Sequence, residues 1–175
     1  MNDPILPFRL SQTAAALCMA AMATSTSLAD VIFWTCPSGG SYASTTCWDG
    51  GVIPDASDTV YFDTGGSYIV LTSQDRDVDS LIISDDVTFG LSDTYTVSGS
   101  LDVVSNIEGE SATLVLASSS MDIASGLVLG GFPNMPGNLN IRAGALMDYG
   151  YLITYSDASI TFGINDDVPL TRSVM

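Results

Sequence analysis

An acidic run in the first half of the chain holds the densest group of side chains that could bind a metal ion or take part in catalysis. Its carboxylates, Asp75, Asp77 and Asp79, occupy alternate positions, and alternate residues of a β-strand point to one face. Several carboxylate oxygens on one face are the ligands that Ca²⁺ prefers. The run lacks the glycine and the distal glutamate of an EF-hand loop. If the strand continued, Leu81 and Ile83 would lie on the same face as the three aspartates, so the acidic run is expected to end before the buried strand begins. We therefore favour a solvated acidic turn ahead of a buried strand, and we expect no cofactor, with Ca²⁺ as the one alternative.

The overall composition narrows the chemistry further. The chain of 175 residues has 20 acidic residues against 4 basic ones, no His, and a net charge of −16. Without His, Ser–His and Cys–His nucleophilic catalysis is excluded and a zinc site is disfavoured. The acidity also argues against nucleic acid and anionic lipid as partners, because proteins bind both through Lys and Arg.

Carboxylates are the remaining route to catalysis. Asp102, Asp122 and Asp148 recur along the chain at positions that could stack into one row, and glycoside hydrolases use paired carboxylates. A polysaccharide lyase would also need a basic residue beside such a site, and after export the chain would retain only three arginines. We therefore predict that the protein is not an enzyme.

Two tryptophans and two cysteines stand together near the N-terminal end. In an exported chain, Cys36 and Cys47 predict one disulfide that closes a Gly/Ser/Thr-rich loop, and two free thiols are the alternative. Trp34 and Trp48 could form a glycan-binding platform, but we favour a capping role in which they shield the first turn of the fold. A packing ladder is likewise the favoured interpretation of three tyrosines expected on one strand face, Tyr149, Tyr151 and Tyr155.

Residues 1–29 have the pattern of a bacterial secretory signal peptide. A weakly positive start with Arg9 precedes the apolar run Thr13–Ala23, and Ser27-Leu28-Ala29 places small residues before a cleavage site at Asp30. The apolar run is too short for a transmembrane helix, and a short buried helix is the alternative. We expect an exported mature chain, secreted, periplasmic or at the cell surface, without membrane insertion.

The mature chain shows the alternation of a β-protein. Short runs alternate apolar residues with Ser, Thr or Asp and are punctuated by Gly, Asp, Asn and Ser, which predicts an all-β fold. The strands that we expect are Thr59–Phe62, Ser67–Leu71, Val78–Ile83, Val87–Leu91, Thr94–Val97, Leu101–Val104, Thr113–Leu116, Met121–Ile123, Leu127–Leu129, Leu139–Ile141, Tyr151–Thr154 and Ile160–Phe162.

Internal repetition favours a β-solenoid over a sandwich or a barrel. In a solenoid each turn hides its apolar residues only by stacking on the next turn, so similar residues recur at the length of a turn. An offset of 25 residues pairs Leu114 with Leu139, Leu116 with Ile141, Met121 with Leu146 and Leu127 with Leu152. A second motif, a strand followed by small residues and another apolar strand, recurs as Val97-Ser-Gly-Ser-Leu101 and Ile123-Ala-Ser-Gly-Leu127.

The segment from Trp34 to Phe62 resembles the opening of many bacterial exported β-helix proteins. It has a Trp, a Gly-rich stretch, Cys47-Trp48 where Asn-Trp is usual, and then Pro54 and the element Asp58-Thr59-Val60-Tyr61-Phe62. Two later stretches, Gly126–Gly131 and Gly137–Ala145, are similar to the repeats of autotransporter passengers and PEP-CTERM-associated repeat proteins. The resemblance covers residues 32–163 and implies an exported, right-handed parallel β-helix that serves as a stalk or an adhesive surface element.

These features together predict four segments. They are a signal peptide at 1–29, an N-terminal capping segment with the disulfide loop at 30–58, solenoid coils at 59–164, and a C-terminal tail at 165–175 where a longer protein could have been truncated. We expect a non-enzymatic, structural or adhesin-like surface module whose partner is a glycan or another cell-surface component. The alternatives are a carbohydrate-binding or carbohydrate-processing β-helix and a fragment of a larger autotransporter-like passenger.

Overall fold

The structure is a computed structural model that describes residues 28–91, 94–118, 120–131, 134–142, 144–155 and 157–163. All but the last two residues of the predicted signal peptide, and the whole predicted tail, lie outside these residues. The described chain is all-β, as predicted, with helix confined to two short 3-10 turns, η1 (Thr45–Cys47) and η2 (Asp49–Gly51). Neither turn is long enough to span a membrane.

The strands follow the alternating pattern of the sequence closely. The expected strand 78–83 is broken at Asp79 into two strands, and three short strands at 31–33, 40–41 and 76–78 were not predicted as such. The strands are β1 (Val31–Phe33), β2 (Gly40–Ser41), β3 (Thr59–Phe62), β4 (Ser67–Thr72), β5 (Arg76–Val78), β6 (Ser80–Ile83), β7 (Asp86–Leu91), β8 (Thr94–Val97), β9 (Leu101–Val103), β10 (Ala112–Leu116), β11 (Ser120–Leu129), β12 (Gly137–Ile141), β13 (Leu146–Thr154) and β14 (Ser159–Phe162).

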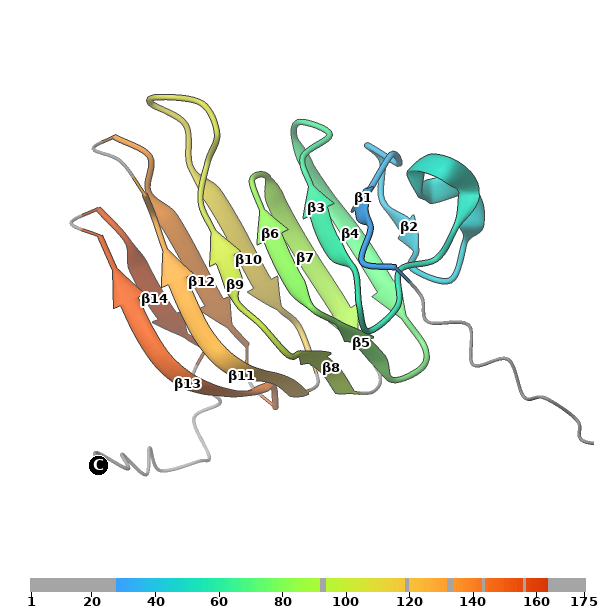
Figure 1. The fold of residues 1–175 in the computed structure, drawn as a ribbon. Helices are drawn as coiled ribbons and strands as arrows, with labels where there is room; N and C mark the ends of the chain where they lie inside the picture. The colour runs from blue at the N-terminus through green and yellow to red at the C-terminus, as the bar shows by residue number, and fades with distance from the viewer. Residues whose placement is uncertain are drawn as a thin grey trace, which may run out of the picture.

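The strands wind into a parallel β-solenoid of about five turns, which confirms the predicted fold class. One sheet has the order β14-β12-β10-β7-β4-β2. The other sheet has two parts that share the long strands β11 and β13. Its front part has the order β1-β3-β6-β9-β11-β13, and its lower part has the order β5-β8-β11-β13. The two parts are joined because β11 and β13 run through the corner between them. Figure 1 shows these layers, with the turns stacked side by side along the molecule. The right-handed winding stays a prediction.

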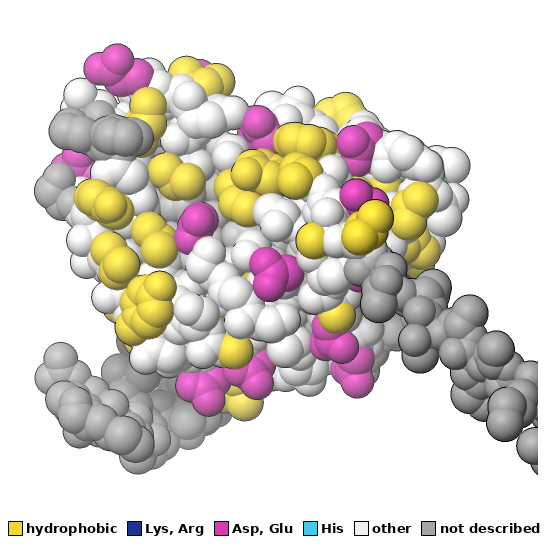
Figure 2. All heavy atoms as spheres, in the orientation of Figure 1, with side chains coloured by type: hydrophobic (Ala, Val, Ile, Leu, Met, Phe, Trp, Pro, Cys, Tyr) yellow, Lys and Arg dark blue, Asp and Glu magenta, His cyan; other side chains and the backbone are white. Residues whose placement is uncertain are grey.

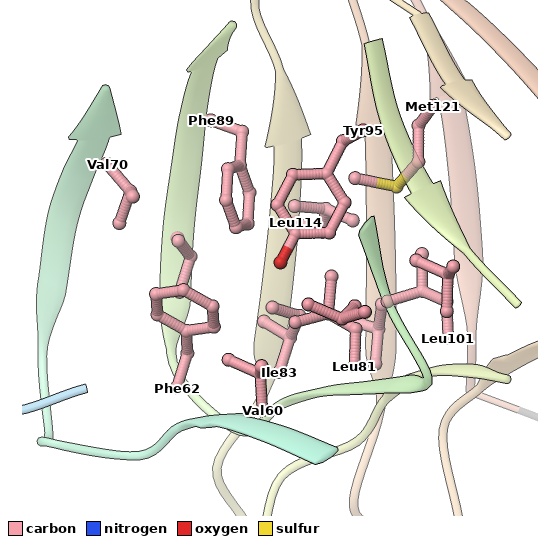
Figure 3. Packing of buried hydrophobic residues seen from close by; sticks show 14 of the residues in the cluster. Val60, Phe62, Val70, Leu81, Ile83, Phe89, Tyr95, Leu101, Leu114 and Met121 are labelled. Atoms are coloured by element: carbon pink, nitrogen blue, oxygen red, sulfur yellow. The ribbon is translucent and has the colours of Figure 1, made fainter. Parts of the chain in front are cut away.

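In-register stacking places one inward side chain of each turn directly on that of the next. The resulting inward rows fill the interior with apolar side chains, since strands such as β3, β4, β8 and β10 alternate buried and outward positions. Figure 3 shows members of several rows pointing toward one another. The rows include Tyr68–Val87–Leu114–Leu139–Ile160, Val70–Phe89–Leu116–Ile141–Phe162, Val78–Val97–Ile123–Tyr149 and Val60–Leu81–Leu101–Leu127–Leu152.

Two buried carboxylates hold corners between strands. Asp85, 8 % exposed, accepts the backbone N–H groups of Thr64 and Gly65 at 2.7 and 3.0 Å and the hydroxyl of Tyr68 at 3.0 Å. Asp58, 3 % exposed, likewise accepts two backbone N–H groups. A buried carboxylate needs such donors to offset the loss of water. These aspartates are therefore structural residues of the turns.

The register confirms three of the four residue pairs predicted at an offset of 25. The fourth is wrong by one residue, since Met121 pairs with Met147 rather than Leu146. The connection from β12 to β13 is one residue longer than that from β10 to β11, and a register shift between Ile123 and Gly126 then removes the difference. The confirmed pairs are Leu114 with Leu139, Leu116 with Ile141 and Leu127 with Leu152.

Candidate functional site

The two tryptophans lie in the interior and present no face to a ligand. Trp34 is 1 % exposed and Trp48 is 3 % exposed, and their rings meet edge to face at 4.9 Å between centroids. Each indole N–H donates to a backbone carbonyl, that of Cys36 at 2.7 Å and that of Tyr42 at 2.8 Å. Stacking on a sugar needs an exposed ring, so the glycan-platform interpretation of these residues is wrong. Their role as a cap stays a prediction.

A hydrogen-bonded pair of phenols lies beside the tryptophans. The hydroxyls of Tyr42 and Tyr95 are 3.1 Å apart, and both rings are buried. Burial raises the pKa of both phenols, so neither ionises at physiological pH. The guanidinium carbon of Arg76 lies 5.2 Å from the centre of the Tyr42 ring, in position for a cation–π contact. This group belongs to the packing of the first turns and offers no reactive centre.

The predicted disulfide is present between Cys36 and Cys47. It closes a loop with a sequence separation of 11 residues around β2 and η1. The backbone N–H of Thr35 also bonds to the carbonyl of Cys47 at 2.8 Å, so the two ends of the loop are joined by more than the disulfide.

Removing this disulfide is expected to destabilise the protein. The double substitution Cys36→Ser with Cys47→Ser lowers the free energy of unfolding by about 2–3 kcal/mol, because the loop gains chain entropy in the unfolded state. Urea unfolding of the two proteins measures the difference. Dithiothreitol should shift the wild-type curve onto that of the variant and leave the variant unchanged, and two coinciding curves without reductant would contradict the prediction.

The acidic run does not assemble into a metal site. Only Asp77 lies within a strand, while Asp75 and Asp79 lie at the corners on either side of β5. Asp75 accepts the backbone N–H of Thr94 at 3.0 Å, and Asp79 accepts the hydroxyl of Ser80 at 2.9 Å. Among the described residues, no three His, Cys, Asp or Glu side chains are grouped so that they could hold a metal ion. The alternative in which the three carboxylates share one strand face is wrong because β5 spans only Arg76–Val78.

The predicted carboxylate row forms only in part. Asp122 and Asp148 are paired in register on the outer surface of β11 and β13, and the same row continues through Thr96 to Asp77. Asp102 lies elsewhere, on β9 in the front part of the sheet. The row therefore has two neighbouring carboxylates and not the three expected.

The three tyrosines of the last turn do not share one face. Tyr149 continues the inward row of Ile123, whereas Tyr151 is paired with Gly126 on the outer face. The register shift between Ile123 and Gly126 separates them, and it could not be inferred from spacing. The predicted packing ladder is therefore wrong, and Tyr149, Tyr151 and Tyr155 are 41 %, 51 % and 50 % exposed.

An apolar row on the outer surface is the feature that best qualifies as a binding site. It crosses the front part of the sheet, one residue per strand, and we call it the front row: Phe33, Tyr61, Ile82, Asp102, Val128 and Ile153. The rings of Phe33 and Tyr61 are stacked with centroids 5.0 Å apart. Figure 2 shows hydrophobic side chains spread across this face with acidic ones between them. Sequence reasoning missed the row, although its members occupy outward positions, which alternate with the buried positions along each strand.

The front row has a neighbour with hydroxyl groups. Thr59 is paired with Ser80 two positions before Tyr61 and Ile82 on the same two strands, and side chains two positions apart point to the same face. Thr59 and Ser80 are therefore the outward neighbours of the front row on β3 and β6. Both are half-buried, and their hydroxyls border the apolar row along one side.

Asp102 is the charged member of the front row. It is flanked in register by Ile82 and Val128, and among the described residues nothing donates to its buried Oδ1. Burial raises the pKa of this carboxyl above the ordinary value, and a contact with Ser100 opposes the shift. The folded protein thus favours the protonated form more than the unfolded chain does.

Asp102→Asn is expected to stabilise the protein at neutral pH. Because the folded pKa is raised, ionisation costs stability as pH rises from about 4, the unfolded value, through the folded value. The variant should therefore unfold at a higher temperature than the wild type at pH 7, and the gain should vanish below about pH 4. Thermal unfolding at both pH values measures it, with the exposed Asp86→Asn as control. An equal gain at both pH values would contradict the assignment to charge.

Comparison of the chain with protein-family models, with curated proteins and with solved structures found no match. The functional inference therefore depends on the surface of the solenoid itself.

Proposed function

We propose that this chain is an exported, non-enzymatic, adhesin-like β-solenoid whose front row binds a cell-surface glycan. The solenoid supplies a rigid support, because the side chains of its inward rows are packed in the interior and only the outward rows remain for contact. The export signal and the resemblance to exported β-helix proteins support the location. The front row supports the adhesive role.

The observation that carries the proposal is the chemistry of this face. Five aromatic and aliphatic side chains and Asp102 form a row across six strands, and the hydroxyls of Thr59 and Ser80 border it. A sugar ring is similarly amphipathic, with C–H groups on its faces and hydroxyls at its rim. Exposed apolar side chains that gather on one face mark interaction sites on soluble proteins. An extended face also suits a chain of several sugar units better than a single one.

The export part of the proposal is tested by the mature N-terminus. The full sequence is expressed in a bacterial host, the cells are fractionated, and the N-terminus of the purified protein is sequenced. We expect a mature chain that begins at Asp30 in the exported fraction. A protein that remains in the cytoplasm with its N-terminus uncleaved would refute export.

The adhesive part is tested by glycan-array binding of the purified wild-type protein and two matched variants. Val128→Lys disrupts the front row, and Val115→Lys changes an outward valine of similar burial on β10, in the opposite sheet. We expect binding to a defined glycan, weakened at least tenfold by Val128→Lys and unchanged by Val115→Lys. Equal binding by both variants would place the contact elsewhere, and no binding by a folded wild-type protein would refute the adhesive role.

A further inference from the structure

Asp102 is the charged side chain in the middle of the front row. Its register neighbours are Ile82 on β6 and Val128 on β11, both half-buried and apolar. Neighbouring strands are about 4.8 Å apart, so a ligand that lies across these two side chains also covers the carboxylate between them. Asp102 therefore influences which ligands the row can accept.

The carboxylate of Asp102 is incompletely paired. The side chain of Ser100 is a hydrogen-bond partner, but the buried Oδ1 receives no donor within the part of the chain that the structure describes. Burial of a carboxylate without enough donors costs free energy. A carboxylate that lowers the stability of the folded protein is typical of functional sites, where local stability gives way to binding.

The described residues supply no positive charge to this carboxylate. The chain has no lysine, and the two arginines in the described part lie elsewhere. Arg76 lies beside the ring of Tyr42, and Arg142 follows β12 in the opposite sheet. Figure 2 shows further acidic side chains among the hydrophobic ones on the face that carries the front row. A positive charge beside Asp102 would therefore come from a ligand.

Covering Asp102 has different consequences for three classes of glycan. A neutral sugar face that packs on Ile82 and Val128 removes water from the carboxylate without supplying a charge, which weakens binding. An anionic glycan is repelled by the carboxylate and by the net charge of the chain, −16. A protonated amino group offsets the loss of water, because an ammonium supplies the opposite charge and up to three hydrogen-bond donors.

We propose that Asp102 makes the front row selective for glycans with free amino groups, such as chains of unacetylated hexosamine. The apolar face of a sugar unit packs on Ile82 and Val128, and its ammonium donates to the carboxylate of Asp102. This inference rests on the proposed function of the front row and adds the class of glycan. The net negative charge of the chain supports it, because such a charge attracts a polycation from a distance.

The test compares two oligosaccharides of equal length, one of glucosamine and one of N-acetylglucosamine. Their binding to the purified protein is measured by isothermal titration calorimetry at about pH 6, above the ordinary pKa of an aspartate. We expect the wild type to bind the glucosamine oligomer about tenfold more tightly, the factor that one hydrogen bond to a charged group supplies.

Two matched variants assign the preference to one carboxylate. Asp102→Asn retains the shape of the side chain, is expected to be more stable than the wild type at neutral pH, and should remove the preference for the glucosamine oligomer. Asp122→Asn should retain the preference, because Asp122 is exposed on the lower part of β11, outside the front row.

The possible results separate this inference from the proposed function. Equal affinity for the two oligomers, lowered by Val128→Lys, would overturn the selectivity and leave the adhesive role intact. Absence of binding by both oligomers would also overturn it, and the glycan array then tests the adhesive role by itself. A preference that Asp102→Asn and Asp122→Asn reduce equally would reflect net charge alone and refute the role of Asp102. Tighter binding of oligolysine, with the same dependence on Asp102, would show that the partner is a cationic protein segment and not a glycan.

Discussion

Phe62→Ala is expected to lower the free energy of unfolding by about 3–5 kcal/mol, the range found when a fully buried phenylalanine is truncated in a packed core. Phe62 is 0 % exposed and lies between the N-terminal aromatic residues and the first turns of the solenoid. Figure 3 shows its ring among the inward side chains of the neighbouring strands. The centroids of four other rings lie 5.2–6.5 Å away, those of Phe89, Trp34, Trp48 and Tyr68.

The cost is large because one substitution removes several contacts at once. Aromatic pairs in this geometry contribute about 0.5–1.5 kcal/mol each beyond the area that they bury. Trp34 and Trp48 both pack against this ring, so the cavity would remove part of the packing between the N-terminal segment and the turns that follow. Chemical denaturation followed by tryptophan fluorescence measures the change, since both indoles report on this site.

Two further variants show whether the effect comes from the ring itself. Phe62→Leu retains most of the buried volume and should cost less than half as much as Phe62→Ala. Phe33→Ala removes a ring that is 40 % exposed on the edge strand β1, and it should cost about 1 kcal/mol. A result in which Phe33→Ala is as destabilising as Phe62→Ala would show that the aromatic cluster is not the centre of the fold.

Gly137→Ala is expected to be at least as damaging, at about 3 kcal/mol or more, although it adds a single methyl group. A Cβ atom at this position would lie 2.0 Å from the carbonyl oxygen of Val103 and 2.2 Å from the backbone nitrogen of Gly130. Those two backbone groups are hydrogen-bonded to each other at 2.9 Å. No side chain can rotate to relieve the clash, because every atom involved belongs to the backbone.

The site explains why the clash cannot relax locally. Gly137 begins β12, where the chain returns from the front sheet to the opposite one and passes directly against the ends of β9 and β11. Moving β12 outward would break its pairing with β10, in which Gly137 stands opposite the fully buried Ala112. The methyl group therefore has to displace two sheets or prevent the turn from closing.

The matched control is Gly109→Ala, in the exposed loop before β10. A Cβ atom there meets no other atom within 4 Å, and the only cost is a backbone φ of 85°. That strain is about 1 kcal/mol for a residue with a side chain. Thermal unfolding should thus show a small shift for Gly109→Ala and a large loss of stability for Gly137→Ala. Similar shifts for both would mean that the close approach at Gly137 is not tight.

Much of the fold followed from features that are local in the sequence. Strict alternation in runs such as Ser67–Leu71 and Thr94–Val97 predicts strands with one buried face, and the structure confirms both. The offset of 25 residues gave the stacking of Leu114 on Leu139 and of Leu127 on Leu152. The disulfide was also within reach of the sequence, because an exported chain without Cys18 has only two cysteines to join.

The surface rows could not be predicted in the same way. Turns differ in length, from 19 residues between Tyr68 and Val87 to 27 between Val87 and Leu114, so no single offset aligns the outward residues. Asp102 could have stacked beside Asp122 and lies instead between Ile82 and Val128. When a corner between two strands is longer or shorter than the corresponding corner of the previous turn, it changes which residues of the two turns stack on each other.

By itself the sequence determined that the chain is a stack of short strands with one apolar face, since alternation and repetition act between residues close in the chain. Only the tertiary structure decided which side chains meet across turns. That choice buried Trp34 and Trp48, turned Asp85 into a hydrogen-bond acceptor for a corner, and assembled the front row from Phe33 to Ile153. It also left Phe162 60 % exposed. The physical reason is that stacking register depends on the lengths of all the corners together, which no local pattern records.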